Sequence, residues 1–427
     1  MKILQVVRMG DGHLGGAELY VCRISELLTE RGHRVEWVIP ENATVPAALS
    51  PYRVWTIPVA RGMRTSRKAW MEFQRILEEA TVDLAILHNT VGFLTPWIIG
   101  ALHRTLPTIK QVHDARAFCP RATPKMLPVR SGAHGVRHCE LRAGWRCVSS
   151  GCLGADRNGP IDVGSWREHG RETLLRLGEL RILRTLPAVL SYSEYVKREL
   201  VRNGVRGDRI HVVGQCLRWS QSQILAKFEA KRSFRKIGAV GRWDSVKGLG
   251  LFLDVALERL RELSVDVEIV GGGPLLAQAQ ARVRAAGAED RIRIWGYVDS
   301  EAMRLFYQRI NVLVVPSLTP EAFCAAGIEA QAHGVAVIGF DSGAVNEWLR
   351  DRIDGRLLPV GDASALEAAI LELLEDPATV RDFGRQGQER ALERYNSAAH
   401  LEPLERLFES IVAGRGTGSR LDAPEVP

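Results

Sequence analysis

The sequence lacks a hydrophobic run long enough to cross a membrane. Nowhere in its 427 residues does a stretch approach the roughly 18 uncharged apolar residues that a spanning helix needs. Met1–Met9 carries one lysine and is followed by no cleavage site of small residues, so a first β-strand explains it better than a signal peptide. We therefore expect a cytoplasmic protein, and peripheral attachment to a membrane remains open.

Blocks of charge of one sign are also lacking. The net charge of +7 favours anionic ligands or surfaces, but arginine and glutamate alternate through most of the expected helices, which is typical of a solvated surface. A nucleic-acid-binding protein would interleave aromatic residues with a basic face, whereas tryptophan and tyrosine are scattered here. A nucleic-acid-binding role is the weakest alternative, and we expect no nucleic acid among the partners.

What is present is an alternation of short apolar runs and amphipathic stretches, which predicts parallel sheets covered by helices. The pattern occurs twice, and the chain is too long for one ordinary core. We predict an α/β fold with two Rossmann-like, doubly wound domains. The expected parts are a first domain at 1–217, a linker at 218–232, a second domain at 233–394, a C-terminal helix at 395–413 that returns to the first domain, and a disordered tail at 414–427.

One segment, 115–166, interrupts this rhythm with several prolines and glycines and four cysteines, Cys119, Cys139, Cys147 and Cys152. A long irregular loop in a compact domain is usually functional or clamped. Four thiolates could close a tetrahedral site, although the spacing contains no Cys-x2-Cys pair. A structural zinc, free or redox-active thiols, and disulfides all remain open.

In each expected domain, a glycine-containing turn follows the first strand. Gly15–Glu18 opens a helix after the first strand, where free N–H groups could meet an anion. Gly241–Gly248 (GRWDSVKG) occupies the equivalent turn of the second half and is not a Walker A loop. Arg242 and Lys247 bracket that turn, and two fixed cations suit a diphosphate whose charge grows as a sugar leaves.

Carboxylates and a histidine also lie at expected strand ends. Glu321 and Glu329 are eight residues apart, one before and one within a helix, so each could reach a different part of a hydroxylated ligand. The N–H groups around Phe323–Ala325 could meet hydroxyls or phosphate. His113 ends a strand, which is where open α/β sheets bind ligands.

Taken together, these segments resemble family 4 of the retaining glycosyltransferases, whose two-Rossmann architecture is called GT-B. The resemblance runs from about Met1 to Tyr395 and depends on the combination of motifs. They are GGAE (Gly15–Glu18), ERGHRV (Glu30–Val35), His113-Asp114, Gly241–Gly248, VEIVGGGP (Val267–Pro274), Val315–Gly339 and SGAVNE (Ser342–Glu347).

The resemblance implies transfer of a sugar from a nucleoside-diphosphate sugar to an unidentified hydroxyl-bearing acceptor, in a cleft between the domains. The implied site residues are Arg242 and Lys247 for the diphosphate, Glu321 for the sugar, Glu329 for the ribose, the N–H groups of Phe323, Cys324 and Ala325 for sugar or phosphate, Gly16 for phosphates or acceptor, and His113 near the reacting sugar. The family also implies that no metal is needed for the chemistry. A nucleotide-sugar epimerase or hydrolase on the same fold is the alternative enzyme.

Three departures from the family pattern stand out. Cys324 and Ala344 replace common glycines, and Gly214–Trp219 replaces the usual Pro-Asn-Gly turn before the second domain. The Cys324 side chain either narrows the space beside the sugar or faces away from it. The changed turn at Gly214–Trp219 predicts a different connection between the domains.

Overall fold

The computed structural model describes residues 1–9, 14–60, 63–119, 125–127, 137–144, 146–147, 163–225, 235–260, 263 and 265–416. The chain folds as two compact units. The first unit comprises Met1–Ala122, Leu141–Cys216 and Ser397–Pro427, and the second comprises Thr123–Glu140 and Leu217–Asn396.

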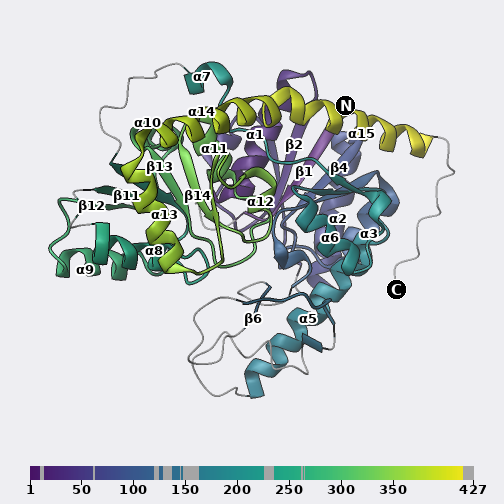
Figure 1. Ribbon diagram of the computed structural model, residues 1–427. Coiled ribbons are helices and arrows are strands. Elements are labelled where there is room, and N and C mark those ends of the chain that lie inside the picture. Colours follow the sequence, from purple (N-terminus) through teal and green to yellow (C-terminus); the bar gives the residue numbers. More distant parts are fainter. Residues whose placement is uncertain are drawn as a thin grey trace. The chain divides into compact units, whose positions relative to one another are not determined.

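The described part of the first unit is built on a parallel sheet in the order β3-β2-β1-β4-β5-β8-β9. Figure 1 labels β2, β1 and β4 of this sheet. Its strands are β1 (Lys2–Val7), β2 (Arg34–Pro40), β3 (Arg53–Ile57), β4 (Leu84–His88), β5 (Thr108–Val112), β8 (Val189–Ser191) and β9 (Ile210–Val212). Its helical segments are α1 (Gly16–Glu30), η1 (Ala47–Leu49), α2 (Met63–Ala80), α3 (Pro96–Thr105), η2 (Ala115–Ala117), α5 (Val163–Leu183), α6 (Glu194–Arg202), η4 (Gly207–Arg209) and α15 (Ser397–Gly416).

The second unit has a parallel sheet in the order β12-β11-β10-β13-β14-β15. Its strands are β10 (Lys236–Val240), β11 (Asp266–Val270), β12 (Ile292–Trp295), β13 (Val312–Val315), β14 (Ala336–Phe340) and β15 (Gly355–Leu358), with a short antiparallel pair of β6 (Met126–Leu127) and β7 (Arg137–His138). Its helical segments are α7 (Gln221–Leu225), α8 (Leu249–Val255), the π-helical η5 (Ala256–Leu260), α9 (Leu276–Ala285), α10 (Ser300–Arg309), α11 (Ala325–Ala332), α12 (Val345–Trp348), α13 (Ala363–Glu375) and α14 (Pro377–Arg394).

Both sheets reverse their strand order at one place. The reversal lies between β1 and β4 in the first unit and between β10 and β13 in the second. Chain segments that leave neighbouring strands at such a switch point diverge to opposite faces, which opens a crevice at the carboxyl ends where α/β proteins bind ligands. The loops after β1, β4, β10 and β13 are therefore where each unit is expected to carry its function.

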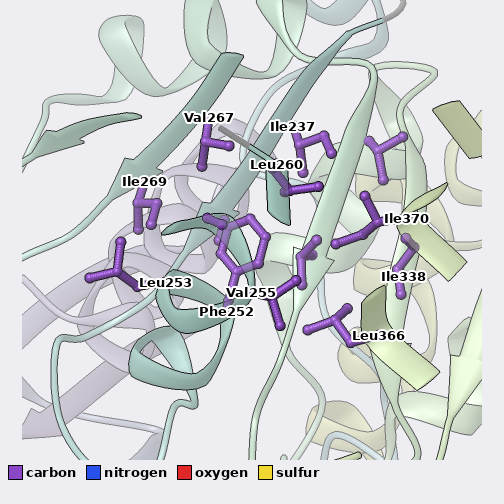
Figure 2. Close-up of a cluster of buried hydrophobic side chains, with 14 of the residues drawn as sticks. Ile237, Phe252, Leu253, Val255, Leu260, Val267, Ile269, Ile338, Leu366 and Ile370 are labelled. Atoms are coloured by element: carbon purple, nitrogen blue, oxygen red, sulfur yellow. The ribbon is translucent and has the colours of Figure 1, made fainter. Parts of the chain in front are cut away.

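The strands are nearly continuous apolar runs because both faces of each sheet are covered. In β13, for example, all four residues Val312–Val315 are buried. Figure 2 shows Phe252 and Leu253 of α8 in one buried cluster with strand residues such as Ile269 in the core of the second unit. Each unit has its own buried cluster, so each sheet is fixed independently of the other.

The fold prediction is confirmed: two parallel-sheet domains with helices on their faces are present. The structure adds helices α3 and α14, which the amphipathic pattern did not indicate. α3 is apolar nearly all round and starts at Pro96, whereas α14 is largely polar and is started by Asp376, whose carboxylate accepts hydrogen bonds from Ala378 N and Thr379 N.

Smaller differences concern segment boundaries. Helix α5 begins at Val163, inside the stretch expected to be an irregular loop, and the same stretch contributes the β6–β7 pair. Within the expected linker the structure places α7, and residues 226–234 lie outside the described part. Helix α15 continues to Gly416, so the expected tail is helical at its start, while 417–427 are not described.

Candidate functional site

The first part of the candidate site is the turn after β10, which Asp244 shapes. The Asp244 carboxylate accepts hydrogen bonds from the backbone N–H groups of Val246 and Lys247, at 3.1 and 3.0 Å. Gly248 follows with φ +67°, and a Cβ there would lie 1.8 Å from the carbonyl oxygen of Pro316. Only glycine allows this approach, so the turn after β10 is held directly against the loop after β13.

Across the switch point, Lys247 meets Glu321. The Lys247 ammonium lies 2.6 Å from Oε1 of Glu321, and the Ser317 hydroxyl donates to the same oxygen. The Glu321 side chain is buried, while a third of the Lys247 side chain is exposed. Burial alone would lower the pKa of Lys247, but the facing Glu321 carboxylate outweighs it, so the pKa is raised. Lys247 therefore stays a cation at neutral pH.

A third loop fixes the backbone of Glu321. Its N–H donates to the carbonyl of Ser342 at 3.2 Å, and its carbonyl accepts from Ala344 N at 2.9 Å. Gly343 lies between them with φ +70°, and a Cβ there would come within 2.4 Å of the Glu321 carbonyl oxygen. The loop after β14 is thus hydrogen-bonded to the loop that carries Glu321. The close approach of the two backbones requires glycine at position 343.

Arg242 takes a different place from Lys247. Its guanidinium pairs with Asp244 at 2.7 Å, and half of its side chain is exposed. The structure therefore puts Arg242 on the rim of the turn, held by the same carboxylate that shapes it.

Helix α11 starts in this region. Cys324 precedes it in the left-handed region, at φ +77°, where a side chain is strained. Burial, and then the Glu321 carboxylate, raise the pKa of the Cys324 thiol to about 12, so it is neutral. Phe323 is buried against the Tyr395 ring, and its carbonyl accepts from the Trp348 indole N–H at 2.5 Å. Ala325 opens the helix, where N–H groups lack intrahelical partners.

Glu329 lies one turn into α11 and is 4% exposed. Its carboxylate receives the Tyr307 hydroxyl at 3.1 Å and the Arg218 guanidinium at 3.2 Å. Burial raises the pKa of Glu329, and both Arg218 and Tyr307 oppose that shift. Sequence reasoning did not identify Arg218, although it stands in Gly214–Trp219, the segment that departs from the family pattern.

In the first unit, His113 lies just after β5 and is engaged on both sides. Its Nε2 lies 2.8 Å from Nδ1 of His88, and its Nδ1 lies 2.7 Å from the Tyr192 hydroxyl. His88 Nε2 in turn lies 2.7 Å from the Gln5 amide oxygen. Burial, and then Lys110, lower the pKa of His113 to about 3, so it is neutral. Its ring is part of a buried hydrogen-bonded row that crosses the switch point of this sheet.

Gly16 is the first residue of α1. Gly15 before it donates its N–H to the Glu18 carboxylate at 3.0 Å, which caps the helix start. A Cβ on Gly16 would meet no described atom within 4 Å. This helix start is therefore open on the side of Gly16.

The cysteine loop is only partly described. Cys119 and Cys147 are buried in the first unit, Cys139 is half-buried in the second, and Cys152 lies outside the described residues. Among the side chains that the structure describes, no group of three or more His, Cys, Asp or Glu is placed to hold a metal.

Over the same described part, none of the helices combines the length and apolarity that crossing a bilayer requires.

Two family models match the chain. Residues 14–216 match the model described as Glycosyltransferase Family 4, and residues 234–376 match that described as Glycosyl transferases group 1. Together they cover most of both units, including Gly16 and His113 in the first range and Lys247, Glu321 and Glu329 in the second.

Several curated proteins are similar in sequence. A phosphatidyl-myo-inositol mannosyltransferase of Mycobacterium leprae is 32% identical over 40% of this chain and 46% of its own. The amylovoran biosynthesis glycosyltransferase AmsK of Erwinia amylovora is 27% identical over 52% of this chain and 56% of its own. In these two, the matched part spans about half the relative. An MMP alpha-(1->4)-mannosyltransferase of Mycolicibacterium hassiacum is 23% identical over 97% of this chain and 99% of its own.

Solved structures share the fold at lower identity. Sucrose-phosphate synthase from Thermosynechococcus elongatus aligns with a TM-score of 0.71 at 20% identity, over 97% of this chain and 99% of that one. HepE from Anabaena, in complex with UDP and glucose, aligns with a TM-score of 0.66 at 16% identity, over 96% and 100%. These neighbours have the GT-B fold. With the matches to both family models, over residues 14–216 and 234–376, the chain belongs to glycosyltransferase family 4.

Proposed function

We propose that the chain transfers a sugar from a nucleoside-diphosphate sugar to a hydroxyl-bearing acceptor and retains the configuration of the sugar. The observation that carries this proposal is the Lys247–Glu321 pair, because a cation and a carboxylate meet where β10 and β13 end, at the switch point of the second unit. A cation there suits the diphosphate, and a buried carboxylate beside it suits sugar hydroxyls.

Each part of the donor would bind different residues, most of them at this edge of the second unit and one, Gly16, in the first unit. Lys247 and Arg242 bind the diphosphate, for which Arg242 turns from Asp244 to the ligand. Glu321 accepts hydrogen bonds from the sugar and Glu329 from the ribose. The N–H groups of Phe323, Cys324 and Ala325 meet sugar or phosphate oxygens at the start of α11, and Gly16 leaves room for phosphate or acceptor.

The reaction would be a displacement on one face of the sugar. The bond from the anomeric carbon to the diphosphate breaks, the bond to the acceptor oxygen forms on the same face, and the acceptor proton passes to the leaving phosphate oxygen. Lys247 and Arg242 stabilise the charge that this phosphate gains, without a metal. His113 contributes near the sugar as a fixed, neutral group, because both of its ring nitrogens already have partners.

The mannosyltransferase names of the relatives suggest a hexose donor, and the UDP complex of HepE suggests a nucleoside diphosphate such as UDP as its carrier. The test incubates the protein with UDP- and GDP-hexoses, with and without hydroxyl-bearing acceptors, and follows donor loss and the anomeric configuration of the product by NMR. Donor loss that needs an acceptor, with retention, is expected. Donor consumed without any acceptor would favour the epimerase or hydrolase alternative, and an inverted product would contradict retention.

We further propose that the protein attaches to membranes peripherally, through a face of the first unit formed by α2 and α3. Met63, Met71 and Trp97 are exposed there by 80, 66 and 40%. Lys68 and Arg64 are exposed about one and two turns before Met71, on the same side of α2. Apolar side chains interleaved with cations suit an anionic lipid surface.

Vesicle sedimentation tests this face. Binding to phosphatidylcholine vesicles that contain phosphatidylglycerol should exceed binding to phosphatidylcholine alone, and Met71→Ser or Lys68→Glu should weaken it. Arg282→Glu, at an exposed ion pair of the second unit, serves as the matched control. Equal binding by Lys68→Glu and wild type would rule this face out.

The four-cysteine site remains a prediction as well. If Cys119, Cys139, Cys147 and Cys152 hold a structural zinc, the purified protein should contain about one metal equivalent per chain. A chelator or Cys139→Ser should then remove the metal and lower the melting temperature, because metal binding contributes to folding energy. A metal-free protein that melts cooperatively and is active would favour free thiols.

A further inference from the structure

The connection into the second unit is built into its candidate donor site. The longer segment of the second unit begins at Leu217, whose N–H donates to the carbonyl of Tyr395 at 2.8 Å. The next residue, Arg218, points its guanidinium at Glu329 of α11, with Nε 3.2 Å from Oε1 and a terminal nitrogen 3.5 Å from Oε2. This segment is the one that departs from the family pattern, and the proposed donor chemistry assigns it no role.

Arg218 is held in place from several sides within the second unit. Its guanidinium lies 4.9 Å from the centre of the Trp219 ring. Trp219 is itself buried, donates its indole N–H to Ser300 at 3.1 Å, and packs edge-on against Tyr307 and His333. Arg218 is therefore anchored next to Glu329, and both partners described here, Glu329 and Trp219, belong to the second unit.

The Glu329 carboxylate needs such a partner. It is 4% exposed, and a buried carboxylate without a counter-charge takes up a proton instead of remaining an anion. Arg218 supplies the charge. The Tyr307 hydroxyl adds a neutral donor, because burial, and then the charge of Glu329, hold the pKa of Tyr307 well above its ordinary value.

The contacts leave part of the carboxylate available. An ionised carboxylate has about four lone-pair positions. Tyr307 and one nitrogen of Arg218 both approach Oε2, whereas the described contact to Oε1 comes from Arg218 Nε. Oε1 can still accept a hydrogen bond from a ligand hydroxyl, so the ion pair orients the group without saturating it.

We propose that Arg218 is a positioning residue of the donor site, which holds Glu329 as an oriented acceptor for the ribose hydroxyls of the nucleotide. This inference rests on the proposed function, since it assumes that Glu329 meets the ribose. It assigns a role to the departure from the Pro-Asn-Gly turn: the connecting segment carries a charged group that completes the nucleotide site.

The test measures binding of UDP and GDP, and of their 2′-deoxy and 3′-deoxy forms, by calorimetry as a function of pH. Wild type should prefer the ribonucleotide over at least one deoxy form by about tenfold, the usual value of a hydrogen bond to a charged group. In Arg218→Ala that preference should fall to within about threefold. Because Arg218 lowers the pKa of Glu329, binding by this variant should also fail at a higher pH than in wild type as the solution is acidified.

Arg218→Lys keeps the charge but not the planar fork, so it should restore the pH dependence and only part of the ribose preference. It also serves if Arg218→Ala does not fold. Arg350→Ala is the matched control, because Arg350 pairs with Asp354, another buried carboxylate of the second unit. It should lower the melting temperature and leave ribose preference and pH dependence unchanged.

The outcomes separate the inference from the function beneath it. An Arg218→Ala protein with wild-type ribose preference and pH dependence would overturn the positioning role alone. A wild type that binds nucleotides without regard to their ribose hydroxyls would overturn both the ribose role of Glu329 and the inference, and leave nucleotide binding standing. A wild type that binds neither UDP nor GDP would overturn the proposed donor class, and the inference with it.

Discussion

The carboxyl edges of the two parallel sheets hold opposite chemistry. At the switch point of the second sheet the side chains are charged and paired, as in Lys247–Glu321. At the equivalent place in the first sheet a row of neutral side chains runs from Gln5 through His88 and His113 to Tyr192. The strand order around both switch points is the same, so the fold itself does not decide what its edge binds.

The difference follows from burial and counter-charge. Around His113 and His88, burial is the largest influence and lowers both pKa values, so the rings stay neutral and are satisfied by one another. Around Lys247, burial also acts against the charge, but a carboxylate lies 2.6 Å away and reverses the shift. A charged edge suits a diphosphate donor. The row of the first sheet carries no charge of its own, and the charge of Lys110, which acts on His88 and His113, is paired with Glu179.

Removing the central cation of the charged edge should have the largest effect. Lys247→Ala should cut turnover at saturating donor by about two to three powers of ten, because one preorganised charge partner of a developing anion contributes about 3–4 kcal/mol. Steady-state kinetics with the nucleotide-hexose that the donor test selects measure this. Lys236→Ala, at the end of β10 opposite to the turn that holds Lys247, is the control and should turn over normally. Turnover of Lys247→Ala within about threefold of wild type would remove the role.

The next largest effect is a difference between the two carboxylates of this edge in how their removal changes nucleotide binding. Glu321→Gln should weaken activity and leave nucleoside-diphosphate binding nearly unchanged, since its proposed partner is the sugar. Glu329→Ala should weaken both, by about tenfold or more for the nucleotide, because a hydrogen bond to a charged group is lost. Calorimetric titration of both variants with UDP and GDP measures the contrast. Equal losses of nucleotide affinity would mean that the division between sugar and ribose is wrong.

The neutral row of the first unit extends to His400, because Tyr20 packs edge-on against both His113 and His400, and we expect this histidine to make the folded state sensitive to acid. His400 of α15 donates Nδ1–H to the Val213 carbonyl at 3.0 Å, so its Nε2 accepts from the Tyr20 hydroxyl at 2.9 Å. Burial lowers the pKa of His400 from 6.5 to about 4, against the effect of the Val213 carbonyl. A depressed pKa means that the unfolded chain binds the proton first. This contribution to stability is complete above pH 6.5 and is lost as the pH falls towards 4.

When the pH is lowered from 7.5 to 5.5, His400 alone should reduce the free energy of unfolding by about 1.4 kcal/mol. His400→Gln should abolish that part of the pH dependence. Urea unfolding of wild type and variant at the two pH values measures it. His211→Gln is a graded comparison: burial, and then Lys197, lower the pKa of this half-buried histidine on β9 as well, so the variant should lose a smaller part of the pH dependence than His400→Gln. Parallel pH dependences in wild type and His400→Gln would show that the ring is not held neutral by the fold.

The architecture could be predicted from sequence because each strand is a short apolar run bounded by turns, and the pattern occurs twice. The sequence pattern also shows where β10, β13 and α11 lie. Because Lys247 and Glu321 follow these strands and Glu329 lies in this helix, the topology predicts that the three side chains are neighbours. Helix α14 was missed because its exposed faces and the glycines that pack beneath it give no clear stripe.

Partners far apart in the chain could not be predicted. His113 was singled out by its place at a strand end, but His88 and Tyr192 lie 25 and 79 residues away along the chain. Arg218 lies 111 residues from Glu329, in a segment without a periodic pattern. Such pairs are fixed by which strands neighbour each other and by side-chain rotamers, and a single sequence specifies neither.

The smallest effect concerns Cys324, which replaces the glycine common in the family. Its φ of +77° costs an ordinary residue about 1–2 kcal/mol, whereas glycine adopts it freely but loses more chain entropy on folding. Cys324→Gly and Cys324→Ala both remove the thiol, and they differ in whether the strain remains. We expect the glycine variant to be more stable than the alanine variant by about 1 kcal/mol, measured by urea unfolding. Equal stabilities would mean that the neighbouring loops relax around a side chain here, and the charged edge would then be less rigid than its contacts imply.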